Sequence, residues 1–136
     1  MTLSRGAHDD IVSHARETAP AECCGLVVGY RGSGGAGGAI VEAVRTRNIA
    51  GDPNRFEIHP ADHIHARRAA RLRGLEVLGF YHSHPHSPAT PSATDLAEAA
   101  YPEHLYLIVS PIAEPADVRL YHLEAGGFKE VPWQLD

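Results

Sequence analysis

Short apolar runs and helix-like segments alternate along this chain of 136 residues, and this alternation constrains its fold more than any other feature. Apolar runs typical of strands occur at residues 24–30, 40–46, 75–84 and 105–111. Segments with helical spacing of their apolar residues lie at residues 8–20, at residues 60–74 and from about Ser92 onward. Interleaved strands and helices predict a mixed sheet with helices packed on it, in the α/β or α+β class.

Two further features complete the predicted order of elements. Residues 55–59 (RFEIH) are predicted to form a short strand, and residues 117–133 a last hairpin that turns at Gly126 and Gly127. The glycine-rich residues 31–39 separate two strand-like runs, which predicts a hairpin with a flexible tip. Because a strand pattern rather than a helix follows these glycines, they do not indicate a phosphate-binding loop.

Size, charge and cysteine usage limit the class of protein. The length is typical of one domain, residues 1–136, with a real hydrophobic core. A net charge of −5 gives no basic surface for nucleic acid. Neither a signal peptide nor a membrane span is expected. The two cysteines, Cys23 and Cys24, are adjacent, which does not suit a secreted disulfide framework. We therefore expect a cytoplasmic protein.

The stretch GFYHSHPHSPATPSATD, residues 79–95, contains the strongest candidate for a metal site. His82 and His84 lie at the end of a strand pattern, where residues i and i+2 project from the same face with Cα atoms roughly 6.5–7 Å apart. Two imidazoles at that separation can bind one cation. His63 and His65 have the same spacing but lie in a predicted helix, where they point in different directions and are expected to be ordinary surface residues.

Asp95 is the candidate for a third ligand, eleven residues after His84. The intervening Pro-rich loop is long enough to bring Asp95 back to the strand end. Ser92 and Asp95 also fit a capping box, so a purely structural role for Asp95 stays open at this point. Two histidines and one carboxylate leave an open position on zinc for water, which is the composition of a hydrolytic site. His86 continues the alternation, but Pro85 interrupts the strand before it.

A hydrolytic site of this kind needs a carboxylate that does not bind the metal, to take a proton from the bound water and pass it to the leaving group. Glu22 is the best candidate. It lies at the start of an apolar strand pattern, where a carboxylate has little structural reason to be. Cys23 and Cys24 beside it would point to opposite faces of a strand, so at most one of them would face the site.

Glu22, the HSHP stretch (residues 82–85) and the PSATD stretch (residues 91–95) together resemble the signature of the JAMM metalloproteases, also called MPN+ domains. The resemblance extends over nearly the whole chain and implies a curved mixed sheet between helices, similar to cytidine deaminases. It implies that His82, His84 and Asp95 bind one zinc ion, that Glu22 is the general acid/base, and that Ser92 polarises the scissile carbonyl and stabilises the oxyanion. The family motif gives His86 no ligand role.

The resemblance further implies a zinc-dependent peptidase or isopeptidase that cuts an amide bond at the glycine-ending tail of a ubiquitin-like protein. The chain resembles the small stand-alone prokaryotic members, some of which process sulfur-carrier proteins. Two alternatives are a non-catalytic MPN interaction scaffold and a DNA-repair-associated relative. Scaffolds typically lack the ligand residues, and the acidic charge argues against the second. The oligomeric state is open, with a homodimer as one option.

Overall fold

The computed structural model describes residues 1–32 and 37–136 and contains eight strands and three helices in that part of the chain. In order they are β1 (Thr2–Leu3), α1 (Arg5–Thr18), β2 (Cys24–Arg31), β3 (Gly38–Thr46), α2 (Pro60–Leu72), β4 (Glu76–Ser83), α3 (Ala93–Glu98), β5 (Leu105–Ser110), β6 (Asp117–Glu124), β7 (Gly127–Val131) and β8 (Gln134–Leu135).

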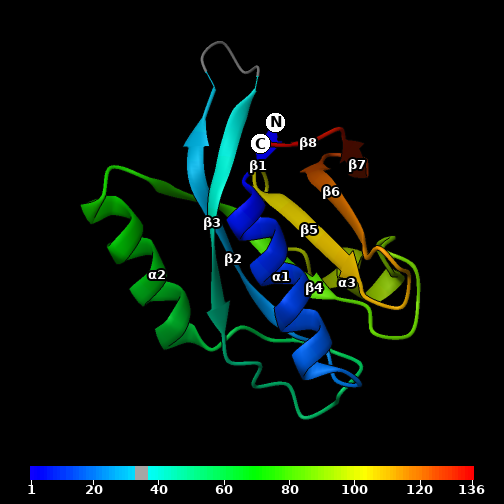
Figure 1. Cartoon of the computed structure of the whole chain (residues 1–136). Coiled ribbons are helices and arrows are strands. Elements are labelled where there is room, and N and C mark those ends of the chain that lie inside the picture. The colour runs from blue at the N-terminus through cyan, green and yellow to red at the C-terminus, as the bar shows by residue number, and fades with distance from the viewer. Residues whose placement is uncertain (33–36) are drawn as a thin grey trace.

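All the strands join one mixed sheet in the order β7-β6-β5-β4-β2-β3-β1-β8. The long β2–β3 hairpin is antiparallel, and β4 lies between β2, to which it is antiparallel, and β5, to which it is parallel. The short strands β1 and β8 pair in parallel at the other edge, which brings the two ends of the chain side by side (Figure 1). Because β4 is central, side chains at its end are supported from both sides.

Helices α1 and α2 pack on opposite faces of the sheet (Figure 1). Strand side chains alternate between the two faces, so Tyr81 of β4 joins the core beneath α1 while Phe80 joins the core beneath α2. His82 follows Phe80 by two residues and therefore points to the α2 face. The alternation thus decides which face of the sheet carries the candidate site.

A close backbone approach sets the pairing of β4 with β5. A Cβ atom on Gly79 would lie 1.9 Å from the carbonyl oxygen of Leu105, so only glycine fits where the two strands meet. Gly74 lies between α2 and β4 and has a φ of 73°, the left-handed conformation that is common just after helices. Gly79 therefore permits the close approach of β4 to β5, and Gly74 permits the turn that precedes β4.

The predicted mixed α/β fold is confirmed, with the three helices and the apolar strands near their expected places. The prediction of a strand at residues 55–59 is wrong, because only Ile58 forms an isolated bridge, with Asn48. The side chain of Asn48 occupies backbone groups of this segment that a neighbouring strand would otherwise bind. The two-residue strands β1 and β8 were not predicted. Residues 33–36 of the predicted hairpin tip lie outside the described residues.

In residues 1–32 and 37–136 none of the helices is both long enough and apolar enough to cross a membrane.

Candidate metal centre

The two histidines of the HSHP stretch lie at the carboxyl end of β4. His82 is in the strand and His84 follows it directly, with 3% and 6% of their surfaces exposed. The backbone N–H of His84 donates to the carbonyl of Val109 in β5, which continues the parallel pairing past the end of β4. The Nε2 atoms of His82 and His84 lie 3.2 Å apart. The strand geometry therefore brings both imidazoles to one point, as the sequence predicts.

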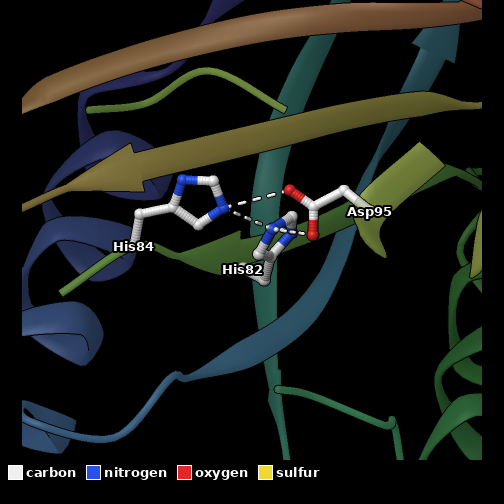
Figure 2. Close-up of side chains that lie close together, drawn as sticks. All are labelled: His82, His84 and Asp95. Atoms are coloured by element: carbon white, nitrogen blue, oxygen red, sulfur yellow. Dashed lines mark hydrogen bonds and ion pairs between the residues drawn. The ribbon is translucent and has the colours of Figure 1, made fainter. Parts of the chain in front are cut away.

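Asp95 approaches this point from the first turn of α3. Its Oδ1 lies 3.2 Å from Nε2 of His82 and its Oδ2 lies 3.1 Å from Nε2 of His84. Figure 2 shows the carboxylate facing the two rings. Among the described residues, these three side chains form the one group of three or more metal-binding side chains whose ligand atoms lie within 4.8 Å of one another.

The capping box at the start of α3 places Asp95 in this position. The Oγ of Ser92 accepts from the backbone N–H of Asp95 at 3.0 Å, and Oδ2 of Asp95 accepts from the backbone N–H of Ser92 at 2.9 Å. The capping box that the sequence indicates is therefore present, and it orients the carboxylate that faces the histidines.

The hydrogen bonds of His84 fix its tautomer. Its Nδ1 lies 2.8 Å from the carbonyl oxygen of Pro88, and since a carbonyl can only accept, Nδ1 carries the proton. In the neutral ring, Nε2 then has the lone pair, which is directed at the centre. Two neutral imidazole nitrogens and a carboxylate suit zinc, and an orienting bond to the second ring nitrogen is usual for histidines that bind zinc.

The loop that joins β4 to α3 is held by bonds to its carbonyl groups. The Oγ of Ser110 donates to the carbonyl of Ser87 at 2.7 Å, and the hydroxyl of Tyr121 donates to the carbonyl of buried Ala89 at 2.8 Å. Together with the bond from His84 to Pro88, three successive carbonyls of the loop are fixed. The return path from β4 to Asp95 is therefore well defined.

Burial and the contacts among the three side chains shift the pKa of each of them. Burial lowers the pKa of His82. Burial opposes ionisation of Asp95, but its hydrogen bonds to His82 and His84 outweigh this and hold its pKa well below the usual range. Burial likewise disfavours the charged form of His84, yet the bond to Asp95 raises its pKa overall.

Glu22 lies just before β2, and its side chain lines the same cavity as the histidines, Ser92 and Asp95. This cavity has a volume of about 310 Å³. The backbone of Glu22 is fixed on both sides, because its N–H donates to the carbonyl of Pro53 and its carbonyl accepts from Nδ2 of Asn48. Burial raises the pKa of its carboxyl to about 7. A carboxyl that titrates near neutral pH suits proton transfer.

Ser92 is exposed to the cavity. Its Oγ is already an acceptor for Asp95, but the hydroxyl proton remains able to donate into the cavity. His86 lines the cavity as well, but it is exposed and lies outside the group formed by His82, His84 and Asp95.

Cys23 and Cys24 are both buried, and burial raises the pKa of each thiol to about 11. Cys23 belongs to the core beneath α1, and the Sγ of Cys24 lies 3.4 Å from Oγ1 of Thr46. Neither thiol is therefore a nucleophile at neutral pH.

His63 and His65 do not converge, as expected, but only His65 is an exposed surface residue. His63 is half-buried: its ring packs edge-on against Phe80, with centroids 5.4 Å apart, and it accepts from Nε of Arg67 at 2.8 Å. Sequence reasoning missed this contact, because helical spacing gives the direction of a side chain but not the aromatic surface that it meets.

Comparison with known proteins shows the family of this chain. Residues 4–124 match the model of a family described as prokaryotic homologs of the JAB domain. The chain is 38% identical to the desampylase of Haloferax volcanii over 116 residues, which is 82% of this chain and 81% of the relative. The chain belongs to the JAB family. It is one of the prokaryotic members of the JAMM/MPN group, as the motif predicts.

Further proteins resemble this chain over most of its length. The CysO-cysteine peptidase of Mycobacterium tuberculosis is 28% identical over 90% of this chain and 82% of its own length. A solution structure from Desulfitobacterium hafniense has a TM-score of 0.89 at 29% identity, covering 99% of this chain and 92% of the other. A structure described as a metalloprotease-like JAMM zinc site has a TM-score of 0.61 at 22% identity, covering 100% and 97%, and supports the fold.

Proposed function

We propose that this protein is a zinc-dependent metallopeptidase that hydrolyses an amide or isopeptide bond at the C-terminal tail of a ubiquitin-like protein. The observation that carries the proposal is the convergence of His82, His84 and Asp95 in a cavity that Glu22 and Ser92 also line. Ligand side chains, a carboxylate that titrates near neutrality and a hydroxyl donor within one cavity are the components of amide hydrolysis by a metal site.

The three converging side chains would hold the zinc ion. Nε2 of His82, Nε2 of His84 and a carboxylate oxygen of Asp95 are the ligand types that catalytic zinc sites use, with one position left open. When bound there, zinc would supply Lewis-acid polarisation of the carbonyl and activation of water.

The remaining groups would move protons and stabilise charge. The carboxylate of Glu22 would accept a proton from the attacking water and deliver it to the nitrogen of the departing amine, so that water and amide become acid and amine. The hydroxyl of Ser92 would donate to the carbonyl oxygen as negative charge develops on it. Because the capping box fixes Ser92 relative to Asp95, this donor is held at a constant place with respect to the ligands.

The substrate class rests on the relatives and on the cavity. Relatives are named desampylase, CysO-cysteine peptidase and TtuB-protein conjugate cleaving protease, and we propose that this chain likewise processes a ubiquitin-like conjugate, a sulfur-carrier protein among the candidates. A cavity of about 310 Å³ suits a slender tail that ends in glycine. Two free cysteines are in keeping with a reducing cytoplasm.

Cleavage of a panel of ubiquitin-like carrier fusions, with metal analysis of the same samples, tests the proposal. We expect one zinc per chain and cleavage after the terminal glycine for wild type, and loss of both zinc and cleavage for Asp95→Asn. A folded wild-type protein that binds no zinc would contradict the proposal and favour a scaffold.

A further inference from the structure

The segment between β3 and α2 contacts the metal centre through one aromatic side chain. Residues 51–55 and 57 of this segment are exposed, but Phe56 is half-buried. Its ring stacks on the ring of His82, with centroids 4.3 Å apart and an angle of 18° between the planes. An exposed segment without regular structure thus covers one face of a buried candidate ligand.

The two histidines are oriented by different kinds of contact. The ring of His84 is oriented by its Nδ1 bond to Pro88. Among the described residues, the hydrogen bonds and ion pairs of His82 all use Nε2, which faces His84 and Asp95 (Figure 2). The flat contact with Phe56 therefore restricts rotation of the His82 ring about its side-chain torsions, in addition to its burial.

The side chain of Asn48 holds Phe56 in place. Its Nδ2 donates to the carbonyl of Arg55 at 3.0 Å, and its Oδ1 accepts from the backbone N–H of Glu57 at 3.0 Å. These two groups belong to the peptide units on either side of Phe56. The backbone N–H of Ile49 also donates to the carbonyl of Glu57, at 2.9 Å. Both flanks of Phe56 are thus fixed by Asn48 and Ile49, which follow β3 closely in the chain.

The same amide connects this segment to the candidate base. Nδ2 of Asn48 donates to the carbonyl of Glu22 at 3.1 Å, in addition to that of Arg55. The backbone N–H of Glu22 in turn donates to the carbonyl of Pro53 in the same segment. Asn48 therefore has one contact that reaches His82 through Phe56 and another that reaches Glu22 directly.

We propose that Phe56 is a positioning residue that aligns His82 for metal binding, and that Asn48 acts through it as well as on Glu22. This inference rests on the metal site of the proposed function. A histidine whose ring can rotate pays an entropy cost on binding a metal, and contacts that orient ligands commonly change metal affinity about 10- to 100-fold. The flat face of Phe56 removes that freedom before the ion binds.

Zinc affinity of the purified protein, measured by competition with a chromophoric chelator, tests the role of Phe56. Phe56→Leu keeps an apolar side chain of similar size but removes the flat face, and we expect its zinc affinity to fall about 10- to 100-fold. Phe56→Trp restores a flat face and is expected to stay within a few fold of wild type. Phe128→Leu is the matched control, because Phe128 lines the same cavity but contacts Tyr106 edge-on rather than a candidate ligand. Its zinc affinity is expected to equal that of wild type.

A double-mutant cycle tests the role of Asn48. If Asn48 acts on zinc through Phe56, Asn48→Ala lowers zinc affinity, and adding it to Phe56→Leu lowers it little further. In zinc-loaded enzyme, Asn48→Ala should lower kcat more than Phe56→Leu does, because it also removes the hydrogen bond to the carbonyl of Glu22. Thermal unfolding of the metal-free variants checks that each is folded.

Two results would overturn the inference: a Phe56→Leu protein that binds zinc as tightly as wild type, or a loss as large in Phe128→Leu. A wild type that binds zinc but cleaves no substrate would refute the proposed function and leave this test valid. A wild type that binds no zinc would overturn both.

Discussion

Replacement of Ser92 separates the cap that its hydroxyl forms from the oxyanion role that we propose for it. The Oγ accepts from the backbone N–H of Asp95 as the cap of α3, and its proton is able to donate to the oxyanion. Ser92→Ala removes both. Ser92→Gly also removes the hydroxyl, but glycine is a tolerable N-cap. Ser92→Thr keeps both groups.

The expected magnitudes differ enough to be distinguished. Loss of an N-cap to alanine costs about 1 kcal/mol of unfolding free energy, whereas glycine costs only a few tenths. Loss of one oxyanion donor costs about 10²- to 10³-fold in kcat. Ser92→Ala should therefore be less stable and slow, Ser92→Gly nearly as stable as wild type and equally slow, and Ser92→Thr close to wild type in both.

Urea unfolding gives the stabilities, and cleavage of a carrier fusion by zinc-loaded protein gives kcat. Zinc content is measured alongside, because the backbone N–H of Ser92 still binds the carboxylate of Asp95 in all three variants and should keep that ligand in place. A Ser92→Gly protein that cuts as fast as wild type would refute the role of the hydroxyl. A Ser92→Gly protein that has lost zinc would instead show that the side chain acts through Asp95.

Three further outcomes follow from the structure. Burial raises the pKa of Glu22 to about 7, and a base must be deprotonated to accept a proton. On the acid limb of the pH–rate profile, kcat/KM should therefore fall about tenfold per pH unit. Bound zinc favours the carboxylate, so a pH–rate series should place this limb at or below pH 7. Removal of zinc by chelation should lower the free energy of unfolding by about 2.7 kcal/mol, measured by urea unfolding. The reference is protein in free zinc at 100 times the Kd for zinc. Gly79→Ala would place a Cβ 1.9 Å from the carbonyl oxygen of Leu105, and the overpacking should cost about 3 kcal/mol in the same assay. Wild-type stability of that variant would contradict the close approach of β4 and β5.

Local patterns predicted the framework of the fold, and long-range contacts decided the rest. Apolar alternation was sufficient to locate β4 and β5, because both strands are buried along most of their length. The segment at residues 55–59 has the same alternation but is not a strand, since Asn48 binds its backbone groups. Nothing in the sequence near Phe56 indicates that the side chain of Asn48, eight residues earlier, binds the backbone on both sides of Phe56. The strands β1 and β8 depend on the two ends of the chain meeting, which no local pattern encodes.

The candidate site was predictable where spacing determines geometry. Two histidines at i and i+2 on a strand must face the same way, and the capping box directs Asp95 toward them. Glu22 was found by its unusual place and by the family motif, and it lines the expected cavity. The stacking of Phe56 on His82 was not predictable, because it joins residues 26 positions apart through a segment without regular structure.

We propose that Glu22 transfers the proton during amide hydrolysis at a zinc-bearing site. The most direct test is the rate of cleavage of a ubiquitin-like carrier fusion by Glu22→Gln, in samples matched to wild type for zinc content. Glutamine keeps the shape but cannot accept the proton, so we expect one zinc per chain and a rate lower by about 10²- to 10⁴-fold. Cleavage by Glu22→Gln at the wild-type rate would show that Glu22 is not the base.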